Sequence, residues 1–130
     1  MRKQILLLAL LLSISVLAGC LGGEEKWERV DAAEFHDLLS EDSNAFLLDV
    51  RTQSEWDDEH IANSYLIPHD QIDARSDELP DDLDATIYVY CRSGNRSQTA
   101  SQSLIDMGYS NIKELKTGIN GWVEAGFATE

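Results

Sequence analysis

Apolar and polar positions along residues 27–130 change between the two-residue period of a strand and the 3.6-residue period of a helix. Short runs of β-branched, aromatic and aliphatic residues predict strands at 27–30, 45–50, 64–67, 86–90 and 112–115. Helices are predicted after Asp31, after Thr52, and over 69–78, 96–107 and 118–125. Strands and helices therefore alternate along the whole segment.

Local signals support these elements. Asp31 followed by Glu34, and Thr52 followed by Glu55, have the spacing of a helix capping box. Gly108 is placed to end the helix over 96–107. The alternation predicts an α/β fold, an open and mostly parallel sheet flanked by helices. In such sheets, ligands bind at the carboxyl ends of the strands.

The first residues have a different pattern. Arg2 and Lys3 precede an apolar run over 5–17, whose 13 residues fall short of the roughly 20 that a membrane helix needs. The run has the length of the apolar region in a secretory signal peptide. The four residues that end at Cys20, LAGC, resemble the lipobox of prokaryotic lipoproteins. That resemblance implies cleavage before Cys20 and a lipid on its sulfur; the alternative is an ordinary signal peptide or an uncleaved anchor.

The chain thus divides into a signal peptide (1–19), a glycine-rich and charged tether (20–26) and a domain (27–130). The expected location is outside the cytoplasm. The lipoprotein would be held through Cys20 on the outer side of the cytoplasmic membrane, or in the periplasm or outer membrane. If Cys20 carries a lipid, Cys91 is the only free thiol. An exported free thiol is at risk of oxidation, so it is either buried or functional.

The charge is strongly acidic, with 10 Lys and Arg against 24 Asp and Glu and a net charge of −14. Cleavage would remove Arg2 and Lys3 and leave 8 basic residues and a net charge of −16. Nothing in such a balance offsets phosphate repulsion, so nucleic acid is not an expected partner. The carboxylates serve either solubility or adaptation to salt.

The most informative segment is CRSGNRS, residues 91–97, between the strand over 86–90 and the helix over 96–107. Cys91 therefore lies at the carboxyl end of a strand and at the start of a helix. Gly94 and Asn95 tolerate left-handed geometry, so the loop can turn several N–H groups inward. Such a nest favours the thiolate of Cys91. A reactive thiolate at Cys91 requires that its sulfur be accessible to solvent. The alternative is a buried structural cysteine.

Positive charge gathers beside this thiol, since Arg92 and Arg96 lie in the same seven-residue segment. They are expected to draw a small anionic substrate toward the sulfur. The predicted substrate-binding residues are Arg92, Ser93, Gly94, Asn95, Arg96 and Ser97. By contrast, the histidines are scattered at His36, His60 and His69 with no ligand spacing, so neither a metal nor a cofactor is expected.

CRSGNRS after a strand resembles the active-site loop of the rhodanese family of sulfurtransferases. Residues 48–51, LDVR, with Glu55–Trp56 resemble a second segment of that family, and 59–64 lie where it has a GHIPGA-type motif. The closing pattern of Gly118, Gly121, Trp122 and Gly126 is similar as well. The resemblance covers roughly residues 28–127.

The resemblance implies double-displacement chemistry without a general base. Cys91 attacks the outer sulfur of a donor such as thiosulfate, and the resulting persulfide passes its sulfur to cyanide or a thiol. Arg92 is the candidate to hold the donor's sulfonate. Arg96 either does the same or pins the loop to the domain. Asp49, Arg51 and Glu55 are expected to support the site, with Arg51 paired to Glu55 across the strand-to-helix turn.

Two other functions compete with this one. Related phosphatases have an arginine six positions after the cysteine; here Ser97 stands at that position and Arg96 is one residue nearer. The shorter loop favours one sulfur atom over a tetrahedral phosphate or arsenate. The second competitor is a persulfide carrier or binding module that serves a dedicated partner protein. The oligomeric state is left open.

Overall fold

The computed structural model describes residues 27–130, so the predicted signal peptide, the tether and Cys20 lie outside the described residues. The strands are β1 (Glu28–Val30), β2 (Phe46–Asp49), β3 (Tyr65–Leu66), β4 (Thr86–Tyr90) and β5 (Asn111–Leu115). The α-helices are α1 (Ala32–Glu41), α2 (Gln53–Asp58), α3 (Arg96–Asp106) and α4 (Gly118–Glu124). None of these helices combines the length and hydropathy that a membrane crossing requires.

The five strands form one sheet in the order β1-β5-β4-β2-β3, and every strand pair in it is parallel. The predicted α/β class with an open parallel sheet is therefore confirmed. The caps also form: the Asp31 side chain accepts the N–H of Glu34, and Thr52 and Glu55 make a complete capping box. Gly108, with a φ of 102°, follows the end of α3 as expected.

The segment 69–78 differs from the prediction of a helix. It contains two 3₁₀ turns, η2 (His69–Gln71) and η3 (Ser76–Glu78), in place of one helix. Only Ile72 of this segment is buried. Without an apolar stripe to pack against the sheet, a long helix gains no tertiary support, and short 3₁₀ turns form instead.

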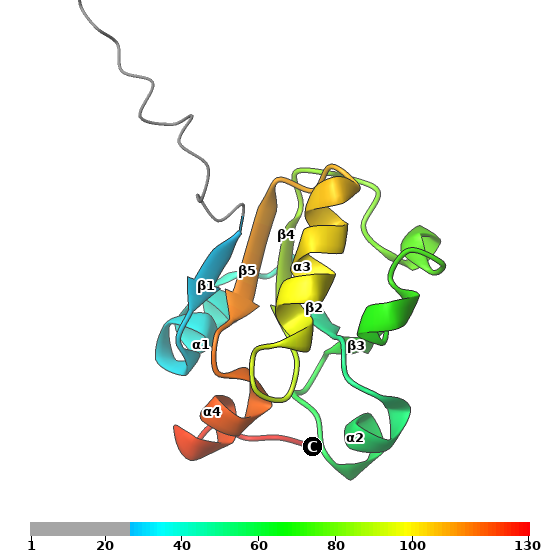
Figure 1. The fold of residues 1–130 in the computed structure, drawn as a ribbon. Coiled ribbons are helices and arrows are strands. Elements are labelled where there is room, and N and C mark those ends of the chain that lie inside the picture. The colour runs from blue at the N-terminus through cyan, green and yellow to red at the C-terminus, as the bar shows by residue number, and fades with distance from the viewer. Residues whose placement is uncertain (1–26) are drawn as a thin grey trace, which may run out of the picture.

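The core has two parts, one on each face of the sheet. Along β4 and beyond it, Ile87, Val89 and Cys91 belong to the cluster beneath α3, while Tyr88 and Tyr90 belong to the cluster beneath α1 and α4. This follows from the two-residue period of a strand. In Figure 1, α3 lies in front of the sheet and α1 behind it. The sequence alternation thus directs Cys91 to the face covered by α3.

The register brings two predicted segments together at the carboxyl edge. Asp49 of β2 lies opposite Tyr90 of β4, and the N–H of Val50 donates to the Tyr90 carbonyl at 3.0 Å. The residues that follow the two strands, Val50 and Cys91, therefore start neighbouring loops. This edge is where the fold class predicts a ligand site.

Candidate functional site

The start of α4 fixes the loop that carries Cys91. The Cys91 carbonyl accepts the N–H of Ile119 at 2.9 Å, and the Arg92 carbonyl accepts the N–H of Asn120 at 3.1 Å. Gly118 has a φ of 64°, and a Cβ there would lie 2.3 Å from the Arg92 carbonyl oxygen. Glycine is therefore required at 118 for α4 to approach the loop this closely.

Two groups contact the Cys91 sulfur inside the loop. The N–H of Gly94 donates to Sγ at 3.1 Å, and the thiol donates to the Ser97 hydroxyl at 3.3 Å. Gly94 has a φ of 99°, and a Cβ there would lie 2.1 Å from the Lys116 carbonyl oxygen. Within the described residues, one amide and one hydroxyl are therefore hydrogen-bonded to the sulfur.

The sulfur is not open to solvent. Cys91 is 1% exposed and packs in the core cluster beneath α3, which contradicts the predicted accessibility. The physical reason is the close packing of the loop against the start of α4, which the sequence does not specify. The outer surface of the loop is exposed at Arg92, Ser93 and Asn95. A donor molecule would reach Sγ only after these outer residues move.

A buried carboxylate lies behind the loop. The Ser97 hydroxyl donates to Glu114 Oε2 at 3.0 Å, and Glu114 is 0% exposed. Arg29 lies opposite Glu114 in the register of β1 and β5, and its Nε is 2.5 Å from Glu114 Oε1. Arg29 also donates to the Gly94 carbonyl at 3.1 Å. One guanidinium therefore neutralises Glu114 and holds the loop.

Sequence reasoning missed Glu114, although a signal was present. Glu114 lies two residues after Ile112 in β5, and Ile112 packs in the cluster beneath α3. A strand places residues two apart on the same face. The predicted strand over 112–115 therefore already placed a carboxylate on a buried face. A buried carboxylate requires a positively charged or hydrogen-bonding partner, because its desolvation is costly.

The two roles left open for Arg96 are now separated by its contacts. Its guanidinium makes a bidentate pair with Glu55, with oxygens at 2.6 and 2.9 Å from Nη1 and Nη2. This pair ties the start of α3 to α2, so Arg96 braces the loop. The Arg96 guanidinium lowers the pKa of Glu55 to about 2, and Glu55 in turn raises the pKa of Arg96.

The predicted pair between Arg51 and Glu55 is wrong at the side-chain level. Arg51 pairs with Asp49 instead, with Nη2 2.6 Å from Oδ2, and both residues are buried. Its guanidinium also donates to the backbone carbonyls of Glu55 and Glu59, at 3.4 and 2.8 Å. The Asp49 carboxylate, two residues away, neutralises the Arg51 guanidinium. Arg51 therefore stabilises the turn through hydrogen bonds to backbone carbonyls and not through an ion pair with Glu55.

Arg92 differs from the other arginines of the site. Its side chain is exposed and makes no ion pair within residues 27–130. It borders a hollow of about 120 Å³. The other residues that line this hollow are Arg51, Glu55, Asp58, Glu59, Ile119 and Asn120. Arg92 is therefore available to an anion, although acidic side chains lie beside it.

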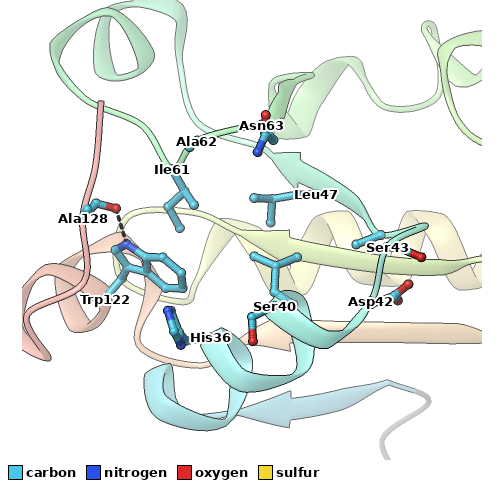
Figure 2. A pocket seen from close by; sticks show the side chains of 12 residues that line it. His36, Ser40, Asp42, Ser43, Leu47, Ile61, Ala62, Asn63, Trp122 and Ala128 are labelled. Atoms are coloured by element: carbon cyan, nitrogen blue, oxygen red, sulfur yellow. Dashed lines mark hydrogen bonds between the residues drawn. The ribbon is translucent and has the colours of Figure 1, made fainter.

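A larger hollow of about 430 Å³ lies on the opposite face of the sheet (Figure 2). Figure 2 shows His36 beside Trp122, whose indole N–H donates to the Ala128 carbonyl at 2.8 Å. The His36 ring stacks on Phe127, with the ring centroids 4.0 Å apart. The residues that line the hollow include no cysteine, and Cys91 packs on the other face, beneath α3.

His60 stabilises its turn, with its ring stacked on Trp56 at 3.7 Å between centroids and Nδ1 3.0 Å from the Trp56 carbonyl. Across residues 27–130, no group of three or more His, Cys, Asp or Glu side chains has the geometry of a metal site.

Comparison with known proteins gives a family match. The model of the rhodanese-like domain matches residues 31–125. A sulfurtransferase of Allochromatium vinosum is 32% identical over 97 residues, which cover 75% of this chain and 89% of that protein. The adenylyltransferase and sulfurtransferase UBA4 of Candida albicans is 34% identical over 100 residues, 72% of this chain. The matched region spans only 23% of that longer relative.

Solved structures agree with the sequence matches. A rhodanese-related protein from Thermoplasma volcanium has a TM-score of 0.70 and 29% identity, over 80% of this chain and 98% of that chain. A thiosulfate sulfurtransferase from Pseudomonas aeruginosa has a TM-score of 0.71 and 30% identity, over 80% of this chain and 20% of that chain.

The pair of Arg96 and Glu55 makes a prediction for stability against pH. The pKa of Glu55 is about 2 when folded, against an ordinary value of 4.5, so its stabilisation is complete above about 4.5 and is lost as pH falls toward 2. Glu55→Gln keeps a hydrogen-bond acceptor for Thr52 but removes the charge. We expect it to lower the free energy of unfolding by about 1 kcal/mol at neutral pH.

Urea denaturation at a series of pH values measures this difference. The gap between the two proteins should shrink as pH falls below about 4.5, because the wild-type carboxylate becomes protonated. Glu124→Gln, at an exposed residue of α4, is the control and should not change stability. A gap that stays constant across the acid range would contradict the assignment.

Proposed function

Because the chain belongs to the rhodanese-like family, we propose that it is a sulfurtransferase that carries sulfur as a persulfide on Cys91. The donor is an anionic sulfane compound such as thiosulfate, and the acceptor is a thiol or cyanide. One observation carries the proposal: Cys91 directly follows the central strand β4, in a loop whose Gly94 amide donates to its sulfur. The relatives named as sulfurtransferases support it.

The proposed reaction has two displacements. The Cys91 sulfur attacks the outer sulfur of thiosulfate, the bond between the two donor sulfurs breaks, and its electron pair leaves with sulfite. The terminal sulfur of the persulfide is then attacked by the acceptor, and Cys91 regains its electron pair as a thiolate. The Gly94 amide stabilises the negative charge on the Cys91 sulfur before the first displacement and after the second.

The burial of Cys91 sets a condition on this reaction. At 1% exposure the sulfur cannot meet a donor, so the proposal includes an opening of the outer part of the loop. The Gly94 carbonyl is held by Arg29 and by the Gln98 side chain, at 3.1 and 2.8 Å. The Arg92 carbonyl is held as well, by the N–H of Asn120 at 3.1 Å. The moving parts are therefore the exposed side chains of Arg92 and Ser93, not the backbone or the amide that contacts the sulfur.

The same burial favours a second candidate function. A cysteine that is inaccessible to small donors is typical of a binding module. It is also compatible with a carrier that accepts sulfur only from a partner protein able to open the loop. Small donors would then be ineffective. The two candidates differ in one measurable step, the formation of a persulfide from thiosulfate alone.

Incubation with thiosulfate is expected to add the mass of one sulfur atom to wild-type protein, localised to Cys91 by peptide mass spectrometry. Cys91→Ser should carry no added sulfur and should retain its fold, because serine is close to cysteine in size. Circular dichroism and thermal melting serve as the control for folding. Absence of the adduct on wild-type protein would favour the binding module.

Arg92→Ala is expected to raise the KM for thiosulfate about tenfold while kcat changes little, because the residue contributes to binding of the anion and not to the sulfur chemistry. Steady-state assays with cyanide as acceptor measure both constants. Lys113→Ala is the matched control, since it also removes one positive charge but at a residue paired with Glu28. An equal change in both variants would show a general charge effect.

We propose further that the chain is exported and held at a membrane by a lipid on Cys20. The support is the sequence alone: a basic start, an apolar run and the residues LAGC. Cys20→Ser is expected to move the protein from the membrane fraction to the soluble fraction of expressing bacteria. Its persulfide formation should not change, and retention in the membrane would contradict the lipid anchor.

A further inference from the structure

The hollow beside Arg92 has charges of both signs, which an anionic donor does not explain. Seven residues line it, among them two arginines and three carboxylates, so the lining carries one net negative charge. A dianion such as thiosulfate is attracted by the arginines but repelled by the carboxylates. The hollow is therefore poorly matched to the proposed donor alone.

Most of the charged groups in this lining already have a partner. Arg51 and Glu55 are each neutralised in an ion pair, at 2.6 Å in both cases. Glu59 accepts a hydrogen bond at 2.9 Å from a hydroxyl of the C-terminal segment. The guanidinium of Arg92 and the carboxylate of Asp58 remain, and neither makes a hydrogen bond or an ion pair with another side chain of residues 27–130.

Asp58 and Arg92 belong to different elements and are both exposed. Asp58 is the last residue of α2, and Arg92 follows Cys91 in the loop. The last turn of α2 contains no basic residue, so the negative end of the helix adds to the charge of Asp58. The hollow thus offers one cation and one anion to a ligand, and a ligand that binds both must carry an anionic and a cationic group.

The volume of the hollow restricts that ligand to a few heavy atoms. Its size of about 120 Å³ leaves room for roughly four water molecules, at about 30 Å³ each in the liquid. Sites for larger organic ligands typically have about 300–1,000 Å³. The two charged groups of the ligand must therefore lie close together, as the ammonium and the carboxylate of an α-amino acid do.

The hollow lies directly beside the cysteine loop. Ile119 lines it and donates its N–H to the Cys91 carbonyl at 2.9 Å, and Arg92 is the next residue after Cys91. In a reaction with two displacements, the donor and the acceptor use the site in turn. Arg92 can therefore bind the sulfonate of the donor first and a carboxylate of the acceptor afterwards, whereas Asp58 serves only the acceptor.

We propose that the acceptor is a small amino-acid thiol, such as cysteine, whose carboxylate binds Arg92 and whose ammonium group binds Asp58. The inference rests on the proposed function for the persulfide on Cys91. The acceptor thiol first loses its proton to solvent, and its thiolate attacks the outer sulfur of the persulfide. The bond between that sulfur and Sγ breaks, and its electron pair stays on Cys91. The products are the persulfide of the amino acid and the Cys91 thiolate, so no oxidant or reductant is needed.

The test is single-turnover transfer of sulfur, from protein already loaded with thiosulfate, to four thiols. Cysteine has both charged groups, cysteamine has only the ammonium group, 3-mercaptopropionate has only the carboxylate, and 2-mercaptoethanol has neither. For each thiol, the rate constant of a variant is divided by that of the wild type. Differences in the intrinsic reactivity of the four thiols then cancel.

Asp58→Asn is expected to slow transfer to cysteine and cysteamine about fivefold and to leave transfer to 2-mercaptoethanol unchanged. Arg92→Ala should slow transfer to cysteine and 3-mercaptopropionate by a similar factor. Asp57→Asn is the matched control, because Asp57 is an exposed neighbour that does not line the hollow. Loading of Asp58→Asn by thiosulfate should be no slower than in the wild type, because the variant removes a negative charge. A merely structural role of Asp58 would instead slow both displacements.

Three results would overturn the proposal. They are an unchanged rate with cysteine in Asp58→Asn, equal slowing of all four thiols in that variant, and the same pattern of rates in Asp57→Asn. The last result would show a general charge effect and no contact in the hollow.

A binding measurement separates this proposal from the proposed function. S-methylcysteine has both charged groups but no thiol, so it binds without reacting. It is expected to shift the NMR signals of the Ile119 and Asn120 amides more than N-acetyl-S-methylcysteine, which lacks the ammonium group. Wild-type protein that forms no persulfide removes the proposed function, while this titration still decides whether the hollow binds an amino acid. Equal shifts with the two compounds would contradict a role for Asp58.

Discussion

The arrangement around the cysteine depends on the ion pair between Arg29 and Glu114. Arg29 comes from the edge strand β1 and Glu114 from β5, and the same guanidinium holds the Gly94 carbonyl. The Gly94 amide in turn contacts the Cys91 sulfur. Glu114 is wholly buried, so removal of Arg29 would leave its charge without compensation, which typically costs about 3–5 kcal/mol. The position of the first strand and the shape of the loop are therefore coupled.

Other basic residues of this acidic chain are also used internally. Arg51, Arg75, Arg96 and Lys113 each pair with a carboxylate. The surplus carboxylates remain unneutralised, so the electrostatic field of the protein repels any anion at a distance. Arg92, exposed at the loop, gives a local attraction that acts only within about a Debye length. Salt therefore weakens the long-range repulsion between the carboxylates and an anion more than it weakens the short-range attraction to Arg92.

The parts of the fold and site that could be predicted are those set by short stretches of chain. The run TIYVY, the capping residues Asp31 and Thr52, and the position of Cys91 at a strand end all rest on local pattern. The same holds for the parallel sheet, because alternating strands and helices allow few other arrangements. The match to the rhodanese-like model confirms the family on these same residues.

The rest could not be predicted because it depends on distant partners. Glu55 lies four residues from Arg51, which made that pair plausible, but its true partner Arg96 is 41 residues away and arrives through the packing of α3. Arg29 and Glu114 are 85 residues apart and meet only because β1 joins β5. The burial of Cys91 likewise depends on how closely Gly118 approaches the loop.

Burial of the thiol both protects it and restricts its reactions. A cysteine that is closed to solvent is shielded from oxidants, but a small molecule does not reach its sulfur either. The Gly94 amide donates to that sulfur from inside the loop, so the group that stabilises a negative sulfur is in place before the loop opens. The proposed reaction therefore requires movement of the outer side chains of the loop and no rearrangement of the amide beneath them.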